Sequence, residues 1–327
     1  MKVKVCIVGG GIAGLAAAAR LQQDGVSCRL IERGAYAGGG MRQAIQDDFG
    51  EIRYGERMSG PEYAERLAAL VRAGATEVRT RETVVGVAKI GADFLVTSVS
   101  PAGVTTTECE SILLAVGGTA RPPKRRFLSG GAPAGVFSGA EAQYYINILG
   151  KRIGRRVVIL GSDNLALSLA RQLVLEGDKV VAVFEPGKEL AASVRTVLHC
   201  VKDLDIPAAA SYTVTRLFGT DSLEGVEVSA VGDKGEPTGE REVVDCDTLV
   251  VSAGFTPDTA LPSALGLTLE GGAPYADASY MTSVPGVFVC GNALRAHSVP
   301  ETAAKEAEEA ADGMLGYLAT KAGRVKA

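Results

Sequence analysis

Residues 9–14 read Gly-Gly-Gly-Ile-Ala-Gly and so contain the spacing Gly-x-Gly-x-x-Gly. In a turn that binds a pyrophosphate, Gly9 would permit the tight bend and Gly11 would let the backbone approach the phosphates without a Cβ in the way. Gly14 would let a helix pack closely on a strand. The start of that helix would offer free N–H groups and its positive dipole end. The spacing therefore predicts a dinucleotide site, and the alternative is a glycine-rich turn without a ligand.

The elements around this turn favour the first interpretation. The expected elements are a strand over Val3–Val8, a helix over Leu15–Gln23 and a second strand over Ser27–Ile31. Glu32 follows the second strand at close to the interval of about 20 residues that such sites show. Its carboxylate can accept hydrogen bonds from a ribose diol and would repel a 2′-phosphate.

A second strand–turn–helix pattern begins near Arg155. Its expected elements are a strand over Val157–Leu160, a turn over residues 161–166, a helix over Leu167–Leu175 and a strand over Lys179–Phe184. The middle glycine of the turn is replaced by Asp163, whose Cβ obstructs a pyrophosphate and whose charge repels it by about 1 kcal/mol at ~4 Å in water. Nucleotide binding is therefore weakened, rearranged or lost. If the site works, Glu185 favours NAD over NADP.

Composition limits the remaining classes. A chain of 327 residues suggests two domains, and a net charge of −4 gives no basic footprint for nucleic acid. Lys2 and Lys4 precede an apolar run, as in a signal peptide, but residues 9–11 interrupt it, and no apolar run reaches the ~18 residues of a membrane span. The cysteines are expected to be buried thiols in a reducing cytoplasm.

Further motifs follow in order along the chain. They are Gly38-Gly39-Gly40, Leu113 to Gly118, Val250 to Pro257 and Thr282 to Asn292. Together with residues 9–14, they resemble the motifs of thioredoxin-reductase-type flavoproteins in the pyridine nucleotide-disulfide oxidoreductase superfamily. The resemblance covers nearly the whole chain. It implies an α/β fold of two Rossmann-like, three-layer dinucleotide-binding domains, the second inserted into the first.

The resemblance also implies boundaries and cofactors. Residues 1–120 and 254–327 would form an FAD-binding domain, and residues 121–253 would form an NAD(P)-type domain with NAD(H) as its candidate cofactor. The first crossing would run from Thr119 to Pro123, stiffened by two prolines. The C-terminal motif ends in Asn292 where the family has Asp, and Asn can still bond a ribityl hydroxyl.

The motifs and the resemblance together assign the candidate cofactor contacts, and no metal site is expected. For FAD they are Gly9, Gly11, Ile12, Ala13, Gly14, Glu32, Arg33, Gly39, Gly40, Met41, Val85, Ala115, Gly117, Gly291, Asn292, Pro300, Glu301 and Thr302. For NAD(P) they are Gly161, Asp163, Asn164, Glu185 and Gly254.

A helix is expected after the C-terminal motif. Residues 298–301 have capping-box spacing, and Pro300 is tolerated in a first turn. By resemblance, the helix N-terminus points at the pyrimidine edge of the flavin, where its dipole would stabilise negative charge. The alternative is an ordinary amphipathic surface helix through Gly316. Its charged residues are interpreted as a solvated face: Lys305, Glu306, Glu308 and Glu309.

The chain has only two histidines. His297 lies just before that helix and is the candidate catalytic residue, as a proton donor or a contact to flavin N1–C2=O. The alternative is an exposed loop residue. His199 and Cys200 are interpreted as structural, because no third ligand or base is visible beside them.

The redox dithiol of the resembled class is missing. The six cysteines lie at positions 6, 28, 109, 200, 246 and 290, and no two have Cys-x-x-Cys spacing. The stretches where that class carries its pair, Leu165–Leu173 and Ala37–Arg42, contain none. Electrons on a flavin here would have to leave directly from it.

A narrower resemblance suggests a complex. Residues 54–66, 133–137 and 290–297 resemble the small flavoprotein that accompanies larger glycerol-3-phosphate-dehydrogenase-like flavoproteins. That subgroup has Gln-Cys-Ile-His where this chain has Gln-Ala-Ile-Gln at residues 43–46, so a thiol and an imidazole are absent. The resemblance implies an oligomer in which a larger FAD-dependent dehydrogenase subunit or a small electron carrier is the partner.

Two functional hypotheses follow. The first is an FAD-dependent oxidoreductase that passes electrons between a nicotinamide cofactor or a partner flavoprotein and a separate acceptor, without a disulfide relay. The second is an FAD-containing scaffold with a degenerate NAD(P) site, which the departures at Asp163, Ala44 and Gln46 motivate.

Overall fold

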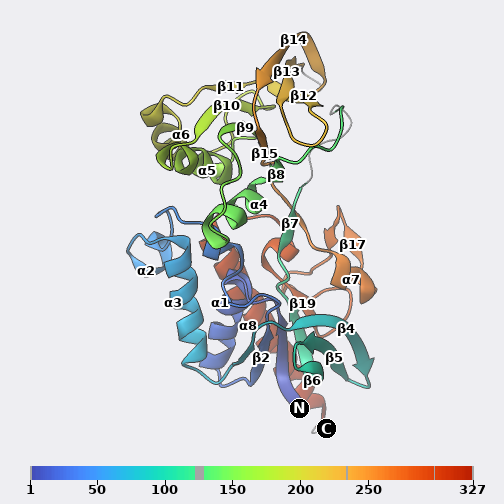
Figure 1. Cartoon of the computed structure of the whole chain (residues 1–327). Helices are drawn as coiled ribbons and strands as arrows, with labels where there is room; N and C mark the ends of the chain where they lie inside the picture. The colour runs from blue at the N-terminus through green and yellow to red at the C-terminus, as the bar shows by residue number, and fades with distance from the viewer. Residues whose placement is uncertain (1, 122–128, 233–234, 298, 326–327) are drawn as a thin grey trace. The chain divides into compact units, whose positions relative to one another are not determined.

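The computed structural model describes residues 2–121, 129–232, 235–297 and 299–325 (Figure 1). The chain divides into two compact units. Unit 1 comprises Met1–Thr119 and Phe255–Ala327, and unit 2 comprises Ala120–Gly254. Unit 2 is therefore inserted between the two segments of unit 1. The two prolines expected to stiffen the first crossing lie outside the described residues.

Unit 1 is built on a mixed sheet with the strand order β3-β2-β1-β6-β5-β4. β19 also pairs with β6, at residues 112–114. The strands are β1 (Lys2–Val8), β2 (Cys28–Ile31), β3 (Glu77–Arg79), β4 (Thr83–Ile90), β5 (Asp93–Ser100), β6 (Gly103–Leu114) and β19 (Val287–Val289). β3, β2, β1, β6 and β19 run parallel, whereas β6, β5 and β4 run antiparallel. The parallel strands are apolar because both faces of the sheet are covered.

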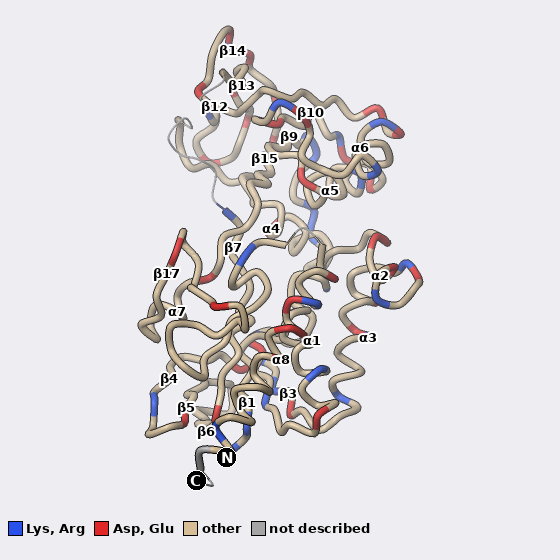
Figure 2. The backbone as a smooth tube through the Cα atoms, turned by 180° about the vertical axis from the view of Figure 1, so that it is seen from behind, with Lys and Arg blue, Asp and Glu red and all other residues tan. Residues whose placement is uncertain are grey.

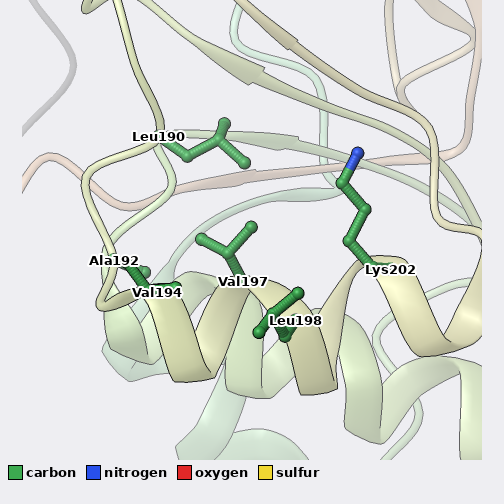
Figure 3. Close-up of a pocket in the computed structure, with 6 residues that line it drawn as sticks. All are labelled: Leu190, Ala192, Val194, Val197, Leu198 and Lys202. Atoms are coloured by element: carbon green, nitrogen blue, oxygen red, sulfur yellow. The ribbon is translucent and has the colours of Figure 1, made fainter.

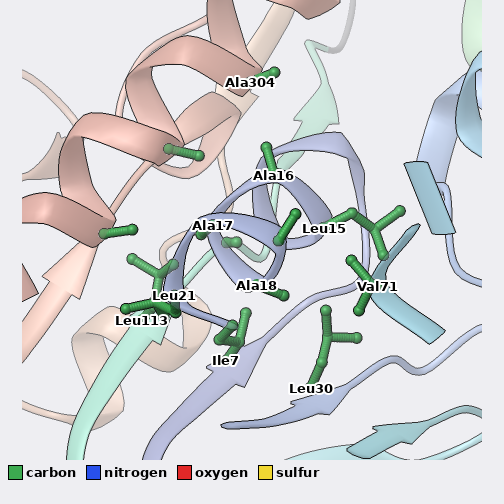
Figure 4. Close-up of a cluster of buried hydrophobic side chains, with 14 of the residues drawn as sticks. Ile7, Leu15, Ala16, Ala17, Ala18, Leu21, Leu30, Val71, Leu113 and Ala304 are labelled. Carbon is green, nitrogen blue, oxygen red and sulfur yellow. The ribbon is translucent and has the colours of Figure 1, made fainter. Parts of the chain in front are cut away.

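The helices of unit 1 pack through small side chains. They are α1 (Ile12–Gln23), α2 (Glu51–Tyr54), α3 (Gly60–Arg72), α7 (Ala260–Ala264) and α8 (Pro300–Val325), with single turns η1 (Gly39–Gln43) and η4 (Gly291–Ala293). Residues 16–19 of α1 are all Ala and all buried, and α8 presents buried Ala304 and Ala307 in the same core (Figure 4). Alanine at these positions allows the helices and the sheet to approach closely. α8 continues to Val325, beyond the expected end at Gly316.

Short strands complete unit 1. β7 (Gly118–Ala120) pairs with β16 (Phe255–Pro257), and β17 (Leu269–Glu270) pairs with β18 (Ala273–Pro274). The first of these ladders lies where the chain leaves unit 1 and returns to it.

Unit 2 repeats the strand–turn–helix plan. Its parallel sheet has the order β11-β10-β9-β15-β8, formed by β8 (Val136–Ser138), β9 (Arg156–Leu160), β10 (Lys179–Glu185), β11 (Ala208–Ala210) and β15 (Thr248–Val251). The helices are α4 (Gly139–Gln143), η2 (Tyr144–Ile148), α5 (Asn164–Leu175), α6 (Val194–Cys200) and η3 (Lys202–Leu204). An antiparallel sheet follows, formed by β12 (Tyr212–Phe218), β13 (Gly225–Val231) and β14 (Pro237–Asp245).

The structure confirms the α/β fold class, with one systematic difference in the helices. α1 and α5 begin at Ile12 and Asn164, three residues before the expected starts. The last part of each glycine turn is therefore the first turn of the helix.

The described residues show no segment of concentrated positive or negative charge and no helix that could span a membrane. Lys and Arg are interspersed with Asp and Glu in each unit (Figure 2). None of the described helices combines the length and the apolar character needed to cross a bilayer. Among the described residues, no group of His, Cys, Asp and Glu has an arrangement that could hold a metal ion.

Candidate functional site

The turn between β1 and α1 requires glycine at two positions and leaves space at a third. Gly9 has φ +104°, and a Cβ there would lie 2.2 Å from the carbonyl oxygen of Ala115. A Cβ on Gly14 would lie 1.9 Å from the carbonyl oxygen of Gly9. A Cβ on Gly11 would have no neighbour within 4 Å. Gly9 and Gly14 therefore serve packing, whereas Gly11 borders an open cradle.

The cradle lies at an uncapped helix N-terminus. Gly11 is the N-cap of α1, with φ −69° and ψ −176°, and no side chain accepts a hydrogen bond from the first turn. The N–H groups of such a turn and its positive dipole end attract an anion. Space and donors thus coincide at Gly11.

The second glycine segment lies against the first. The Gly38 N–H donates to the Gly10 carbonyl over 2.7 Å, and a Cβ on Gly39 would lie 3.1 Å from the Gly11 Cα. The Glu32 carboxylate closes the other side, where it accepts the Gly10 N–H at 2.7 Å and the Gly34 N–H at 2.5 Å. These contacts fix the Glu32 carboxylate at the end of β2.

The C-terminal motif reaches the same place. A Cβ on Gly291, which has φ +64°, would lie 2.7 Å from the Ala13 Cβ in the first turn of α1. The Asn292 Oδ1 accepts the backbone N–H of His297 over 3.0 Å. The acceptor oxygen of Asn292 is therefore used to close the loop that precedes α8.

The start of α8 carries a buried carboxylate with a free acceptor. Glu301 Oε1 accepts the Gly50 N–H over 2.7 Å, whereas Glu301 Oε2 is buried with no hydrogen-bond partner among the described residues. Pro300 and Thr302 flank Glu301 in the first turn. Ser298, the expected cap residue, lies outside the described residues. The open space at Gly11 and the unpaired buried oxygen of Glu301 are both features that a bound cofactor would satisfy.

The structure corrects the expected exposure of Glu306 in α8 and excludes an exposed position for His297 in the loop before it. Glu306 was expected on a solvated face but is buried, whereas Lys305 and Glu309 are exposed and Glu308 is half-buried. His297 is not an exposed loop residue, because only 9% of its side chain is accessible. The helical spacing could have indicated Glu306, because Ala303 and Ala310, three before and four after it, are also buried.

The remaining candidates for FAD contacts are spread over unit 1. Ala115 follows β6 and is buried, Gly117 has φ +78°, and Gly40 and Met41 lie in η1. The Arg33 side chain is exposed, and Val85, 59% exposed, lies at a bulge of β4. Among the described residues, the Arg33 side chain makes no hydrogen bond to the cradle, and the Val85 side chain is apolar.

The turn between β9 and α5 reproduces the first turn except at one position. Gly161 has φ +101°, and a Cβ there would lie 1.9 Å from the Ser252 carbonyl oxygen. Glu185 accepts hydrogen bonds from the Ser162 hydroxyl at 2.6 Å and the Gly187 N–H at 2.7 Å, much as Glu32 accepts two N–H groups. The framework of a nucleotide turn is therefore retained in unit 2.

Asp163 occupies the position that corresponds to Gly11. Its backbone, with φ −68° and ψ 173°, nearly matches that of Gly11. Its carboxylate accepts the Ala166 N–H at 2.9 Å and the Ser252 hydroxyl at 2.9 Å. Burial, and then the nearby Glu185 charge, raise the pKa of Asp163 above its ordinary value. The carboxylate thus satisfies the helix N-terminus where a phosphate would bind. Asn164 follows it in α5, and Gly254, with φ +77°, ends unit 2.

Other candidate features lie elsewhere. A shallow apolar hollow in unit 2 is formed between α6 and the preceding loop (Figure 3), lined by Leu190, Ala192, Val194, Val197, Leu198 and Lys202. None of the predicted site residues lines it. His199 is exposed and pairs with Asp203 over 3.1 Å, whereas Cys200 is buried.

The packing role of Gly14 leads to a testable difference between two glycines. Gly14→Ala should destabilise the FAD-free protein by about 1–3 kcal/mol, because the added Cβ overlaps the Gly9 carbonyl. Gly316→Ala should stabilise it by about 0.5–1 kcal/mol, because Gly316 is an exposed position inside α8 with open space around it. Urea unfolding of both variants measures this, and equal effects would contradict the packing role.

Comparison with known proteins agrees with a two-domain dinucleotide-binding oxidoreductase fold. T. acidophilum thioredoxin reductase superposes with a TM-score of 0.79 at 22% identity, covering 98% of this chain and 99% of that one. The family model for pyridine nucleotide-disulphide oxidoreductases matches residues 3–311. The chain therefore belongs to this family, whose members are FAD-dependent oxidoreductases that use NAD(P)H. The expectation of such an enzyme is confirmed at the level of the family.

Two relatives found by sequence match this chain over part of their own length. Ferredoxin–NADP reductase 2 of Bacillus mycoides (strain KBAB4) is 25% identical over 185 residues, which cover 56% of this chain and 53% of the relative. Sarcosine oxidase subunit alpha of Corynebacterium sp. (strain P-1) is 27% identical over 277 residues, which cover 79% of this chain and 27% of the relative. The match spans only about half of the ferredoxin–NADP reductase and less of the sarcosine oxidase subunit.

Proposed function

We propose that unit 1 binds FAD and that the protein is an FAD-dependent oxidoreductase. The observation that carries this proposal is the open cradle at Gly11, which lies at the uncapped N-terminus of α1. The pyrophosphate would bind there, and Glu32 would accept hydrogen bonds from the ribose. When bound, FAD supplies the chemistry of accepting and releasing an electron pair.

The other predicted FAD contacts remain part of this proposal. Gly39 and Gly291 support it because both lie against the cradle, beside Gly11 and Ala13. Glu301 supports it through its unpaired buried oxygen, which can accept a hydrogen bond from the cofactor. Arg33 and Val85 have no such contact in their favour.

We propose that electrons leave without a disulfide relay. The sequence has no Cys-x-x-Cys, and all six cysteines are buried. Burial raises the pKa of Cys28 to about 12 and also raises that of Cys290. Because only a thiolate attacks a disulfide, these thiols are inert at neutral pH. The same buried thiols support a reducing compartment, and we place the protein in the cytoplasm.

We propose that the protein works as a subunit of a multi-component dehydrogenase. Asp163 supports this, because its carboxylate caps the N-terminus of α5 and so disfavours binding of a pyridine nucleotide in unit 2. A partner flavoprotein would then be the electron donor. The sarcosine oxidase relative is by name a subunit. The partner would be a larger FAD-dependent dehydrogenase subunit or a small electron carrier, as in the small flavoproteins that accompany glycerol-3-phosphate-dehydrogenase-like proteins.

A second candidate is an FAD-containing scaffold with a degenerate NAD(P) site, which the same carboxylate favours. Anaerobic titration of the FAD-loaded protein separates the candidates. Bleaching of the flavin band by micromolar NADH or NADPH would show a working nucleotide site. Bleaching only after a partner subunit and its substrate are added would support the subunit role. No bleaching under either condition would leave the scaffold, and a protein that refuses FAD would refute both.

A further inference from the structure

A single buried carboxylate gathers the loop before α8. Glu306 lies in the second turn of α8, and only 6% of its side chain is accessible. Its Oε1 accepts the Gly291 N–H over 2.7 Å and lies 3.1 Å from the His297 Nε2. Its Oε2 pairs with the Arg295 Nε over 2.6 Å. The three partners come from residues 291–297, so one side chain of α8 fixes both ends of the loop.

This loop is continuous with the proposed FAD cradle. Gly291 lies against Ala13 in the first turn of α1, and its carbonyl accepts the N–H groups of Leu294 and Arg295 at 2.8 and 3.0 Å. Glu306 is therefore one hydrogen bond from a residue that contacts the phosphate turn. The electrostatic effect of a charge on Glu306 would reach the proposed cofactor site through buried protein, where salt screens it only weakly.

The charges of this cluster are paired. A buried carboxylate is costly unless a cation and hydrogen bonds compensate it, and Arg295, 59% exposed, supplies the cation. Because a carboxylate only accepts hydrogen bonds, the His297 Nε2 must carry the proton in this contact, and a neutral ring would then have Nδ1 as an acceptor.

We propose that the Glu306–Arg295 pair sets the reduction potential of the FAD, and that Glu306 is the positioning residue that fixes the tautomer of His297. This inference rests on the FAD site proposed above. Reduction places additional negative charge on the cofactor. A nearby negative residue therefore disfavours the reduced form, and a nearby positive residue favours it.

Substitutions of Glu306 and Arg295 should shift the midpoint potential of the FAD in opposite directions. Glu306→Gln keeps the shape and removes the negative charge, which leaves Arg295 unbalanced, so the midpoint potential should shift upward. Arg295→Gln leaves Glu306 unbalanced, so the potential should shift downward. Glu309→Gln makes the same chemical change at an exposed position of α8 and should leave the potential close to that of the wild type. Anaerobic dye equilibration measures all four proteins at one pH.

A purely structural role predicts a different result. If Glu306 and Arg295 only hold the loop, both substitutions should loosen it and shift the potential in the same direction. Shifts of the same sign, or no shift in either variant, would overturn the electrostatic proposal.

The tautomer of His297 is measured without the cofactor. In FAD-free protein carrying His199→Gln, the only remaining histidine signal is that of His297, and its ¹⁵N shifts should report a proton on Nε2. Glu306→Ala should abolish this preference. A proton on Nδ1 in the parent protein would refute the positioning role. Failure of the wild type to bind FAD would instead refute the proposed function and, with it, the effect on potential.

Discussion

Gly11→Asp is expected to weaken FAD binding about 1,000-fold. The introduced carboxylate would lie in the cradle beside the pyrophosphate. Two like charges about 4 Å apart repel by about 4 kcal/mol at an effective dielectric constant of 20. Isothermal titration of FAD-free protein with FAD measures the loss.

The chain itself shows how an Asp at this position would sit. Asp163 has nearly the same backbone angles as Gly11 and folds its carboxylate onto the first turn of its own helix. The Gly11→Asp protein should therefore fold normally and gain a few tenths of a kcal/mol from the new cap.

Gly11→Ala is the matched control, because its Cβ enters open space without a charge. We expect a smaller loss of affinity for this variant than for Gly11→Asp. Unchanged FAD affinity in a folded Gly11→Asp protein would mean that the pyrophosphate binds elsewhere, and the proposed site would be wrong.

The reverse substitution in unit 2 should create affinity. Asp163→Gly removes the carboxylate from a turn that otherwise keeps its geometry, with Gly161 and Glu185 in place. Relief of the charge repulsion should raise the affinity for NADH on the order of 100-fold, and loss of the cap should cost only a few tenths of a kcal/mol. Titration with NADH, followed by nicotinamide fluorescence, measures the gain.

A control variant distinguishes the effect of the Asp163 charge from the effect of its size. Asp163→Asn keeps a capping oxygen and a Cβ but loses the charge, so its NADH affinity should lie between those of the wild type and Asp163→Gly.

The NADH affinity of the wild type should also depend on pH. Because burial raises the pKa of Asp163, this affinity should increase as the pH falls toward that pKa, where the carboxyl group becomes neutral. Neither variant has this carboxyl group, and neither should show the increase. Equal affinities in all three proteins would mean that Asp163 does not control the site.

Much of the fold could be predicted because its signals are local. The glycine spacing, the apolar strands and the acidic residue after the second strand all lie within about 30 residues of one another, the length of one βαβ unit. The predicted helix starts lie three residues too late in both units, because the pattern of apolar residues in the sequence does not distinguish the last part of a turn from the first turn of a helix.

The candidate site was less predictable where its contacts join distant segments. Glu306 carries a charge in a helix with other charges, which is typical of a solvated face. Its partners Gly291 and His297 lie in the loop just before α8, and only the folding of that loop back onto the helix brings their N–H groups to the carboxylate. The contact between Glu301 and Gly50 spans most of the chain, and no local pattern indicates it.

The sequence by itself determined the two nucleotide-type turns, the family resemblance and the lack of a dithiol, because each depends on residue type and short spacing. Tertiary structure decided what those residues do: Gly11 borders open space, Asp163 fills the equivalent space with its own carboxylate, and the buried Glu306 of α8 holds the preceding loop. Burial and hydrogen-bond partners depend on which segments pack together, and packing between segments far apart in sequence leaves little trace in either one.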